Sequence, residues 1–165
     1  MSSLLMTGFP GFLGSALLPK VLARREGVQA VCLVQPQHLE LARERVAEIE
    51  GAHPHVAGRI VLVEGDITIP GLGVDVTHRP LLADVTEVWH LAAVYDLSVP
   101  EPVARRVNVE GTGHIIEFCT SRAQLERLHY VSTCYVSGDF DGIFTENDID
   151  LGQGFLNHYE YTKLE

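Results

Sequence analysis

The chain has 165 residues, of which 46% are hydrophobic and 21% are charged, and its formal net charge is −10. This length and composition are sufficient for one substantial hydrophobic core. The acidic balance argues against a nucleic-acid-binding surface, because phosphate binding requires concentrated Lys and Arg. No apolar run approaches the roughly 20 residues of a membrane span, and the N-terminus has no secretory-signal pattern. Three cysteines without ligand spacing predict reduced thiols and a cytoplasmic protein: Cys32, Cys119 and Cys134.

The first predicted element is a buried strand over residues 3–7, which enters a glycine-rich turn and then a helix over residues 12–25. The turn carries Gly8, Gly11 and Gly14, spaced Gly-x-x-Gly-x-x-Gly rather than as the Gly-x-Gly-x-x-Gly fingerprint. Glycine permits a positive φ in a tight turn and lets the backbone approach a diphosphate at the helix N-terminus. The pattern favours a dinucleotide site, with a plain strand-to-helix turn as the alternative.

Strands and helices alternate along the rest of the chain. Further strands are predicted at 29–34, 60–64, 86–91 and 128–133, and further helices at 37–50, 101–120 and 156–165. This alternation is typical of βαβ units and a parallel sheet. Right-handed crossovers predict the strand order 3-2-1-4-5, so the fold class is α/β with a doubly wound parallel sheet of the Rossmann type.

A tyrosine and a lysine stand four residues apart near the end of the sequence. Tyr159 and Lys163 would share one face of the last predicted helix. An ammonium beside a phenol favours the phenolate, which predicts a lowered pKa for the tyrosine and a proton-transfer role. Hydroxyl residues, including Thr133, end the strand about 26 positions earlier, where ligands bind in open α/β sheets.

Together these motifs resemble the extended short-chain dehydrogenases/reductases. The matching segments, in the order of that family, are Thr7–Gly14, Gly65–Thr68, His90–Ala93, Asn108–Thr112, Val131–Thr133 and Tyr159–Lys163. Within the family, the stretches GFLG, VSTCYVSG and NHYEYTKLE are most similar to the branch that reduces acyl thioesters, the fatty acyl-CoA reductases and carrier-protein thioester reductases.

The resemblance implies specific roles for residues of this chain. The catalytic group would be Thr133, Tyr159, Lys163 and Asn108, the last anchoring a proton-relay water. The cofactor would contact Gly8, Phe9, Pro10, Gly11, Phe12, Leu13, Gly14, Gln35, Arg43, Asp66, Ile67, Leu91, Ala92, Ala93, Tyr159 and Lys163. Residues 1–165 would form one NAD(P)-binding domain that stops before the family's last strands and its substrate region, as the N-terminal part of a longer chain.

The choice of cofactor depends on the end of the second strand. NAD selection uses an acidic residue there, which accepts hydrogen bonds from the ribose hydroxyls. This chain has Gln35, where thioester-reducing relatives commonly carry Arg. Because a carboxylate is absent and His38 and Arg43 lie nearby in the sequence, the prediction is NADP in preference to NAD.

The predicted function is an NADP-dependent oxidoreductase that reduces an acyl thioester or aldehyde with a Thr-Tyr-Lys site. The alternatives are a nucleotide-sugar epimerase or dehydratase, or a steroid-type dehydrogenase, on the same scaffold, and a non-catalytic module that binds NAD(P)H. The expected partner is a small-molecule or acyl-thioester substrate, and a homodimer is left open.

No metal site is expected, because the pair His53 and His55 lacks a third ligand and the acidic residues of 139–150 lack calcium-loop spacing. His90 is interpreted as a packing residue rather than a base.

Overall fold

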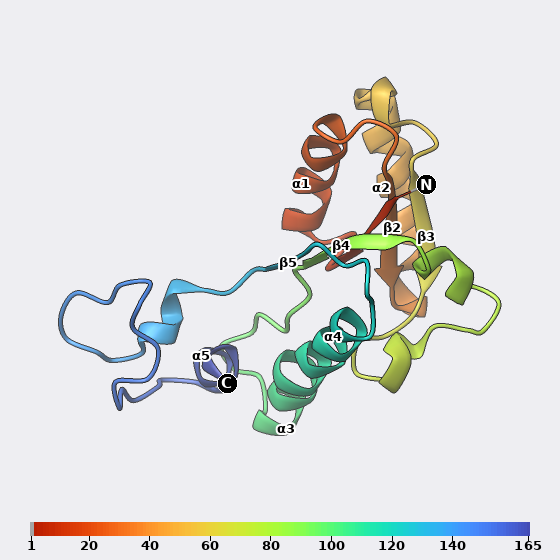
Figure 1. Ribbon diagram of the computed structural model, residues 1–165. Coiled ribbons are helices and arrows are strands. Elements are labelled where there is room, and N and C mark those ends of the chain that lie inside the picture. Colours follow the sequence, from red (N-terminus) through yellow and green to blue (C-terminus); the bar gives the residue numbers. More distant parts are fainter. Residues whose placement is uncertain (1) are drawn as a thin grey trace.

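The computed structural model describes residues 2–165 and contains one parallel sheet in the order β3-β2-β1-β4-β5 (Figure 1). The predicted strand order is therefore confirmed. The strands are β1 Ser3–Thr7, β2 Gln29–Val34, β3 Ile60–Glu64, β4 Val85–His90 and β5 Arg127–Tyr130. The first three agree with the sequence prediction, β4 is shifted by one residue, and β5 ends three residues early.

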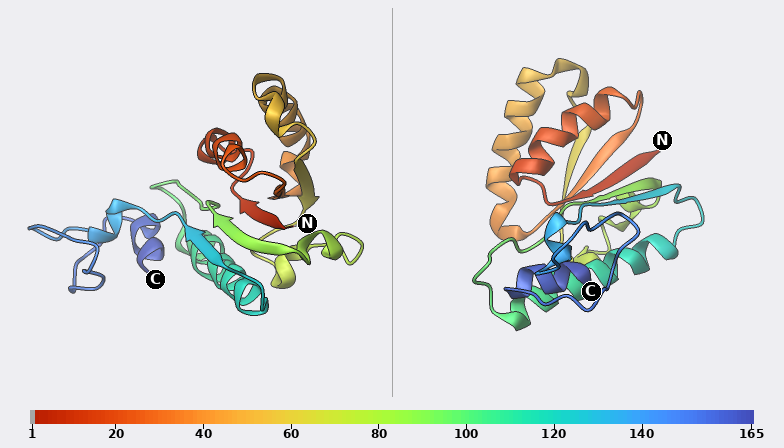
Figure 2. Two further views of the ribbon diagram at one scale, coloured as in Figure 1. Left: turned by 45° about the horizontal axis from the view of Figure 1, so that its top comes forward. Right: turned by 90° about the vertical axis from the view of Figure 1, so that its left-hand side faces the viewer.

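Helices cover both faces of this sheet, as Figure 1 and the turned views of Figure 2 show. One face carries α1 Phe12–Ala23 and α2 Leu39–Ala52. The other face carries α3 Glu101–Ala104, a π-helical segment Arg105–Glu110 and α4 Gly111–Thr120. The last helix, α5 His158–Leu164, lies beside α3 and the π-helical segment.

The two hydrophobic clusters follow from the alternation of side chains along each strand. On β1, Leu4 and Met6 point toward α1 and α2, whereas Leu5 points to the opposite face. Leu18 and Leu22 of α1 close the first cluster. The central strands β1 and β2 are buried on both faces, as expected for the middle of a parallel sheet.

The predicted helix 101–120 is continuous but not uniform, because its middle, Arg105–Glu110, is wound as a π-helix. Such segments are rare and often occur at functional sites. Sequence periodicity at this length does not distinguish π from α winding, so the prediction could place the helix but not its irregular part.

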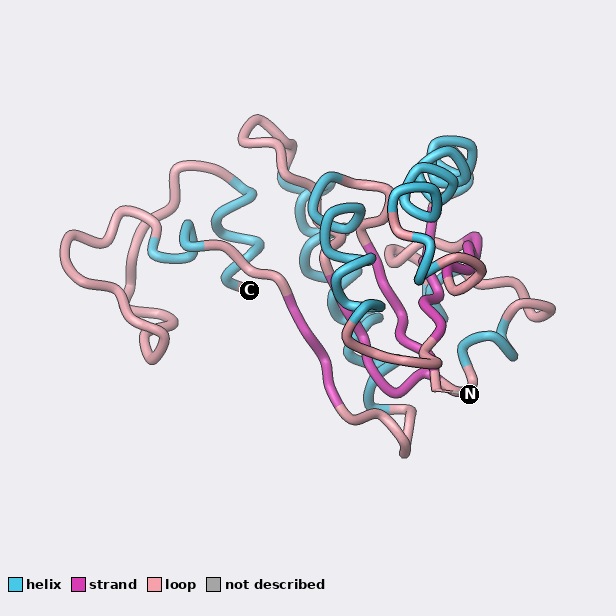
Figure 3. The backbone as a smooth tube through the Cα atoms, turned by 90° about the horizontal axis from the view of Figure 1, so that it is seen from above, coloured by secondary structure: helices cyan, strands magenta, loops and turns pink. Residues whose placement is uncertain are grey.

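A long exposed segment separates β5 from α5, and it extends away from the sheet in the view from above (Figure 3). It contains one short 3₁₀ turn, Cys134–Ser137, and several exposed apolar side chains, including Ile143 and Leu156. No helix in residues 2–165 combines the length and the apolar character needed to cross a bilayer.

Candidate functional site

A cavity of about 940 Å³ opens at the carboxyl ends of the strands. The sheet runs from β1 toward β2 in one direction and toward β4 in the other, so this is the switch point where ligands bind in open α/β sheets. Its wall is made mainly by residues at or after the ends of the five strands, with others from α1, α2, the π-helical segment and α5. The lining residues are Thr7, Gly8, Phe9, Pro10, Gly11, Phe12, Leu13, Leu33, Gln35, His38, Leu41, Gly65, Asp66, Ile67, Thr68, Leu91, Ala92, Ala93, Val94, Tyr95, Val107, Val131, Ser132, Tyr159 and Lys163.

The glycine turn is closed by contacts to the Gly8 carbonyl. A Cβ on Gly11 would lie 2.7 Å from that oxygen, and one on Gly14 would lie 2.8 Å from it. Gly8 itself has a φ of +81°, and a Cβ there would lie 2.8 Å from the Leu91 carbonyl carbon. The sequence interpretation gave these glycines the role of leaving room for a diphosphate. The structure shows that glycine is also needed to form the turn, because a side chain at Gly11 or Gly14 would collide with the Gly8 carbonyl and open the turn.

An acidic residue is held at the base of the cavity by a network that does not include Arg43. Asp66 accepts hydrogen bonds from the Thr68 amide at 2.8 Å and from Gln35 Nε2 at 2.8 Å. Burial raises the pKa of Asp66, but these bonds and the charge of Arg106 outweigh it and hold the pKa below its ordinary value. The side chain of Gln35 is thereby oriented with its amide nitrogen on the carboxylate.

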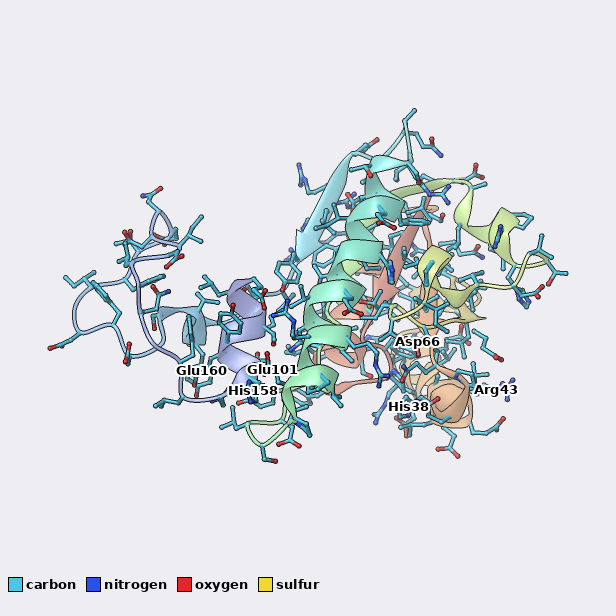
Figure 4. The ribbon with its side chains drawn as sticks, turned by 90° about the horizontal axis from the view of Figure 1, so that it is seen from below. His38, Arg43, Asp66, Glu101, His158 and Glu160 are labelled. Atoms are coloured by element: carbon cyan, nitrogen blue, oxygen red, sulfur yellow. The ribbon has the colours of Figure 1, made fainter. Side chains whose placement is uncertain are left out.

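Arg43, an expected cofactor contact, does not reach the cavity. Its guanidinium pairs with Glu40 one turn earlier on α2, and the side chain is 61% exposed. Figure 4 shows Arg43 at the outer side of α2, extending away from the molecule. His38 lines the cavity instead. The helical phase of α2 explains the difference, because residue 43 points to solvent while Ala42 packs into the core.

The end of β4 is joined to β1 through the Thr7 hydroxyl. Thr7 Oγ1 accepts the amides of Leu91 at 3.2 Å and Ala92 at 3.1 Å, which fixes the backbone that lines the cavity. It also contacts His90 Nδ1 at 2.7 Å. His90 is 1% exposed, and burial, with the charge of Lys163, lowers its pKa to about 4. Its interpretation as a structural residue rather than a base agrees with this geometry.

The start of α5 is set by a cap that places Tyr159 at the cavity. The Asn157 side chain accepts the Glu160 amide at 3.0 Å and donates to Glu160 Oε1 at 2.9 Å, a reciprocal cap of the helix N-terminus. Figure 4 shows Glu160 and His158 on this helix, next to Glu101. Tyr159 is 6% exposed, and its ring meets Tyr95 edge-on at 4.9 Å between centroids.

The pKa of Tyr159 is raised rather than lowered, which corrects the sequence expectation. Burial is the largest cause, and a hydrogen bond with the Thr133 side chain offsets only part of it. Thr133 therefore lies with Tyr159, although Ser132 and not Thr133 lines the cavity. The sequence interpretation relied on Lys163 to favour the phenolate, but this ammonium is engaged elsewhere.

Lys163 lies in the cavity wall and donates to Tyr130 Oη at 2.6 Å and to the Val131 carbonyl at 3.0 Å. Its side-chain nitrogen also lies 4.1 Å from the centroid of the Tyr130 ring. The residue is 5% exposed, and burial lowers its pKa to about 8. In residues 2–165 no hydrogen bond joins Lys163 to Tyr159, so the two share a helix face without pairing directly.

Asn108 lies behind the cavity rather than in it. Its Oδ1 accepts the Val94 amide at 2.9 Å, and its Nδ2 donates to Thr162 Oγ1 at 3.1 Å. The side chain is 2% exposed and joins the π-helical segment to both α5 and the segment after β4. Its amide is thus used to position these elements.

Sequence reasoning missed several lining residues, chiefly Tyr95, Val94, Ser132 and Thr7. Their position in the sequence could have identified them, because each stands at or shortly after the end of a strand, as the predicted contacts Ala92 and Ala93 do.

The acidic segment 139–150 forms local turns. Asp148 accepts a hydrogen bond from the Thr145 amide at 2.8 Å, and Asp150 accepts one from the Gly152 amide at 3.0 Å. Residues 2–165 contain no group of three His, Cys, Asp or Glu side chains placed to hold a metal.

The lowered pKa of Lys163 predicts that the protein is stabilised when this lysine is removed. At pH 7 both the folded and the unfolded states carry the ammonium, so the full penalty of its burial is present. The penalty falls as pH rises above about 8, where only the unfolded state stays protonated, and is gone above 10.5. We expect Lys163→Met to raise the free energy of unfolding at pH 7 by about 1–2 kcal/mol after allowance for solvent screening.

Urea denaturation at pH 7 and at pH 10.5 measures this effect, with the exposed Lys20→Met as the matched control. The gain of Lys163→Met should shrink at the higher pH, and Lys20→Met should show no gain. A Lys163→Met protein less stable than the original at pH 7 would contradict the assignment of a burial penalty.

The cavity fits a dinucleotide on structural grounds. The turn that opens it is made of glycines without room for a Cβ, and it leads into the first turn of α1, whose amides have no partner within the helix. Such a turn binds phosphate oxygens. The cavity is lined by Asp66 and Gln35 as well as by Tyr159 and Lys163.

Comparisons with known proteins identify the family of the chain. The sequence profile of a family of NAD-binding domains described as "Male sterility protein" matches residues 6–165. Fatty acyl-CoA reductase 1 of Arabidopsis thaliana is 24% identical over 170 residues, which cover 92% of this chain and 35% of the relative. The chain therefore spans about a third of the length of this curated relative.

Two solved structures are similar over nearly the whole chain. The terminal R domain from the myxalamid PKS-NRPS biosynthetic pathway has a TM-score of 0.78 and 29% identity, covering 99% of this chain and 43% of that one. UDP-glucuronic acid 4-epimerase from Bacillus cereus in complex with NAD has a TM-score of 0.71 and 26% identity, covering 98% and 49%. With the profile match, these findings show that the chain belongs to the male sterility protein family of NAD(P)-binding domains, within the extended short-chain dehydrogenases/reductases.

Proposed function

We propose that this chain is the cofactor-binding and proton-transfer domain of an NADPH-dependent reductase that acts on an acyl thioester or an aldehyde. The observation that carries the proposal is that Tyr159 and Lys163 line a cavity that the glycine turn also lines, with Thr133 beside Tyr159. The resemblance to a fatty acyl-CoA reductase supports an acyl thioester as the substrate class.

The nicotinamide, when bound, supplies the hydride. The residues of this chain then hydrogen-bond and protonate the carbonyl oxygen of the substrate. In this proposal the Thr133 hydroxyl hydrogen-bonds the oxyanion as negative charge develops on it. Tyr159 gives that oxygen its proton. Because the pKa of Tyr159 is raised by burial, the phenol is protonated at neutral pH, which suits an acid in the direction of reduction.

Lys163 has a separate part in this scheme. Its ammonium lies in the cavity wall beside the tyrosine, where it can hold a ribose hydroxyl and stabilise the phenolate that proton transfer leaves behind. On an acyl thioester, addition of hydride and proton gives a hemithioacetal, which collapses to an aldehyde and a free thiol. Asn108 donates to Thr162 on α5 and so helps to position the helix that carries Tyr159 and Lys163.

The cofactor preference gives a testable prediction. We expect NADPH to bind more tightly than NADH, and Gln35→Arg to widen the difference because a guanidinium binds a phosphate bidentately. The gain should be limited to roughly tenfold, since Asp66 lies next to residue 35 and would compete for the new charge. Arg43→Ala is the matched control, because Arg43 points to solvent and should leave both affinities unchanged. Tighter binding of NADH by the unmodified protein in calorimetric titration would contradict the NADP assignment.

The function is tested by following NADPH absorbance with an acyl-CoA, an aldehyde and a UDP-sugar offered separately to the complete natural chain that carries these residues. The account predicts oxidation with the acyl-CoA or the aldehyde. A second candidate, a nucleotide-sugar enzyme, is supported by the structural similarity to UDP-glucuronic acid 4-epimerase. Epimerases and dehydratases regenerate their cofactor and consume no NADPH, so the UDP-sugar arm is analysed for a converted sugar nucleotide after addition of NAD. Cofactor binding without NADPH oxidation and without conversion of the UDP-sugar would leave the non-catalytic binding module as the function.

A further inference from the structure

A buried chain of hydrogen bonds leads from the glycine turn to Lys163, and its direction can be assigned. Thr7 Oγ1 already accepts two backbone amides, so its single proton points to His90 Nδ1. His90 is neutral, because burial lowers its pKa to about 4, and its one ring proton is therefore on Nε2. That nitrogen donates to Thr112 Oγ1 at 3.1 Å.

Thr112 is the next residue in this chain of contacts, on the side toward β5. Its hydroxyl donates to the Asn108 carbonyl at 2.6 Å, so its oxygen is an acceptor for its other neighbours. Tyr130 lies beside Thr112, whose side chain lowers the pKa of the phenol, and the Tyr130 ring stacks on His90 with centroids 5.5 Å apart. Burial raises the pKa of Tyr130 more than Thr112 lowers it, so the phenol keeps its proton at neutral pH.

Lys163 contacts both the hydroxyl and the ring of Tyr130. Its Nζ donates to Tyr130 Oη at 2.6 Å. The same ammonium lies over the Tyr130 ring and donates to the Val131 carbonyl. Three of the contacts of this buried cation therefore come from two adjacent residues of β5 and its end, and none comes from Tyr159.

We propose that Tyr130 is a positioning residue of the active site, which holds the Lys163 ammonium at the cavity wall through its hydroxyl and its ring. The contact between Tyr130 and Lys163 is independent of the proposed function. Its predicted effect on NADPH binding rests on that function. Tyr130 itself does not line the cavity, whereas Lys163 and Val131 do. Its role is to fix which way the lysine points, and the chain from Thr7 fixes the orientation of Tyr130.

The environment of Lys163 makes the phenol the decisive contact. Arg105, on the π-helical segment, is engaged by Glu165, and Glu160 is engaged in the cap of α5. No carboxylate forms an ion pair with Lys163 in the described residues, so neutral oxygens and an aromatic face provide its stabilisation. The titratable groups on α3, the π-helical segment, β5, the 3₁₀ turn and α5, with those at the end of β4 and after α5, are Glu101, Arg105, Arg106, Glu110, Arg127, His129, Tyr130, Cys134, Tyr135, His158, Tyr159, Glu160, Tyr161, His90 and Glu165.

The test uses the fact that the 165-residue chain has only two lysines, Lys20 and Lys163. Labelling lysine side chains with ¹³C and ¹⁵N gives two side-chain signals, and Lys163→Met identifies the one from Lys163. Titration of the unmodified protein should give Lys163 a pKa of about 8. In Tyr130→Phe the ring stays and only the hydroxyl is lost, so we expect the Lys163 pKa to fall further by about one unit, because the ammonium loses an acceptor.

Tyr161→Phe is the matched control, since Tyr161 is on the same helix and its ring contacts Phe155 instead. It should leave the Lys163 titration unchanged. Thr112→Val should move the Lys163 pKa in the same direction by less, and Thr112→Ser should restore it, because serine keeps the hydroxyl. A Lys163 titration in Tyr130→Phe that superimposes on that of the unmodified protein, with folded signals retained, overturns the proposal.

A second measurement connects the contact to the cofactor. Tyr130→Phe should weaken NADPH binding by roughly three- to tenfold, as expected when one hydrogen bond no longer holds a ligand-binding side chain in place. The titration needs neither cofactor nor substrate. If the unmodified protein binds no NADPH, the proposed function fails while the titration still decides the role of Tyr130.

Discussion

Replacing Tyr159 with Phe should lower the turnover of a long-chain acyl thioester by about two to four orders of magnitude, the usual contribution of a positioned general acid. Binding of NADPH should be retained, because the ring of residue 159 still packs against Tyr95 and only the hydroxyl is lost. The measurement is steady-state oxidation of NADPH by the complete natural chain, with calorimetry for the cofactor. The expected pattern is a loss in kcat with little change in cofactor affinity.

The control for this experiment is Tyr161→Phe, which removes a hydroxyl from the same helix outside the cavity. It should keep full activity. Thr133→Val should reduce turnover in the same direction, since Thr133 hydrogen-bonds with Tyr159 and would serve the same carbonyl oxygen. Undiminished activity in Tyr159→Phe would remove the phenol from the chemistry and contradict its role as the general acid.

Gly11→Val should reduce NADPH affinity at least a hundredfold. A Cβ at residue 11 would lie 2.7 Å from the Gly8 carbonyl oxygen, a contact that backbone atoms cannot relieve without opening the turn. The turn also carries the amides at the start of α1, so its deformation removes the phosphate site along with the space for it. Calorimetric titration with NADPH gives the affinity, and circular dichroism shows whether the sheet and helices persist.

Gly113→Ala provides the matched control for the glycine turn, because a Cβ at residue 113 in α4 meets nothing within 4 Å. It should leave both the affinity and the fold unchanged. Retained NADPH affinity in Gly11→Val would place the dinucleotide somewhere other than this turn.

The sheet was predictable because its signals are local and repeated. Apolar runs such as Leu4–Met6 give strands, and the handedness of crossovers leaves one strand order. The lining residues after β1 and β4 were predictable for the same reason, since strand ends in a parallel sheet converge on one edge.

The side-chain partners were not predictable in this way. Spacing puts Tyr159 and Lys163 on one helix face, but it cannot reveal that Tyr130, on a strand 33 residues earlier, is within 2.6 Å of the lysine. Similarly, proximity in sequence suggested Arg43 as a phosphate ligand, while the phase of α2 turns it to solvent. Such contacts depend on how the elements pack together, and the packing cannot be derived from the spacing of residues in one sequence.

The most direct test of the account follows the hydride itself. NADPH carrying deuterium on the transferring position of its nicotinamide is mixed with the complete natural chain and a long-chain acyl-CoA, and the aldehyde product is analysed by mass spectrometry. The account predicts one deuterium on the aldehyde carbon and one free thiol released for each aldehyde formed, with both lost in Tyr159→Phe. An aldehyde without deuterium, or thiol released with no aldehyde, would contradict hydride transfer at this site.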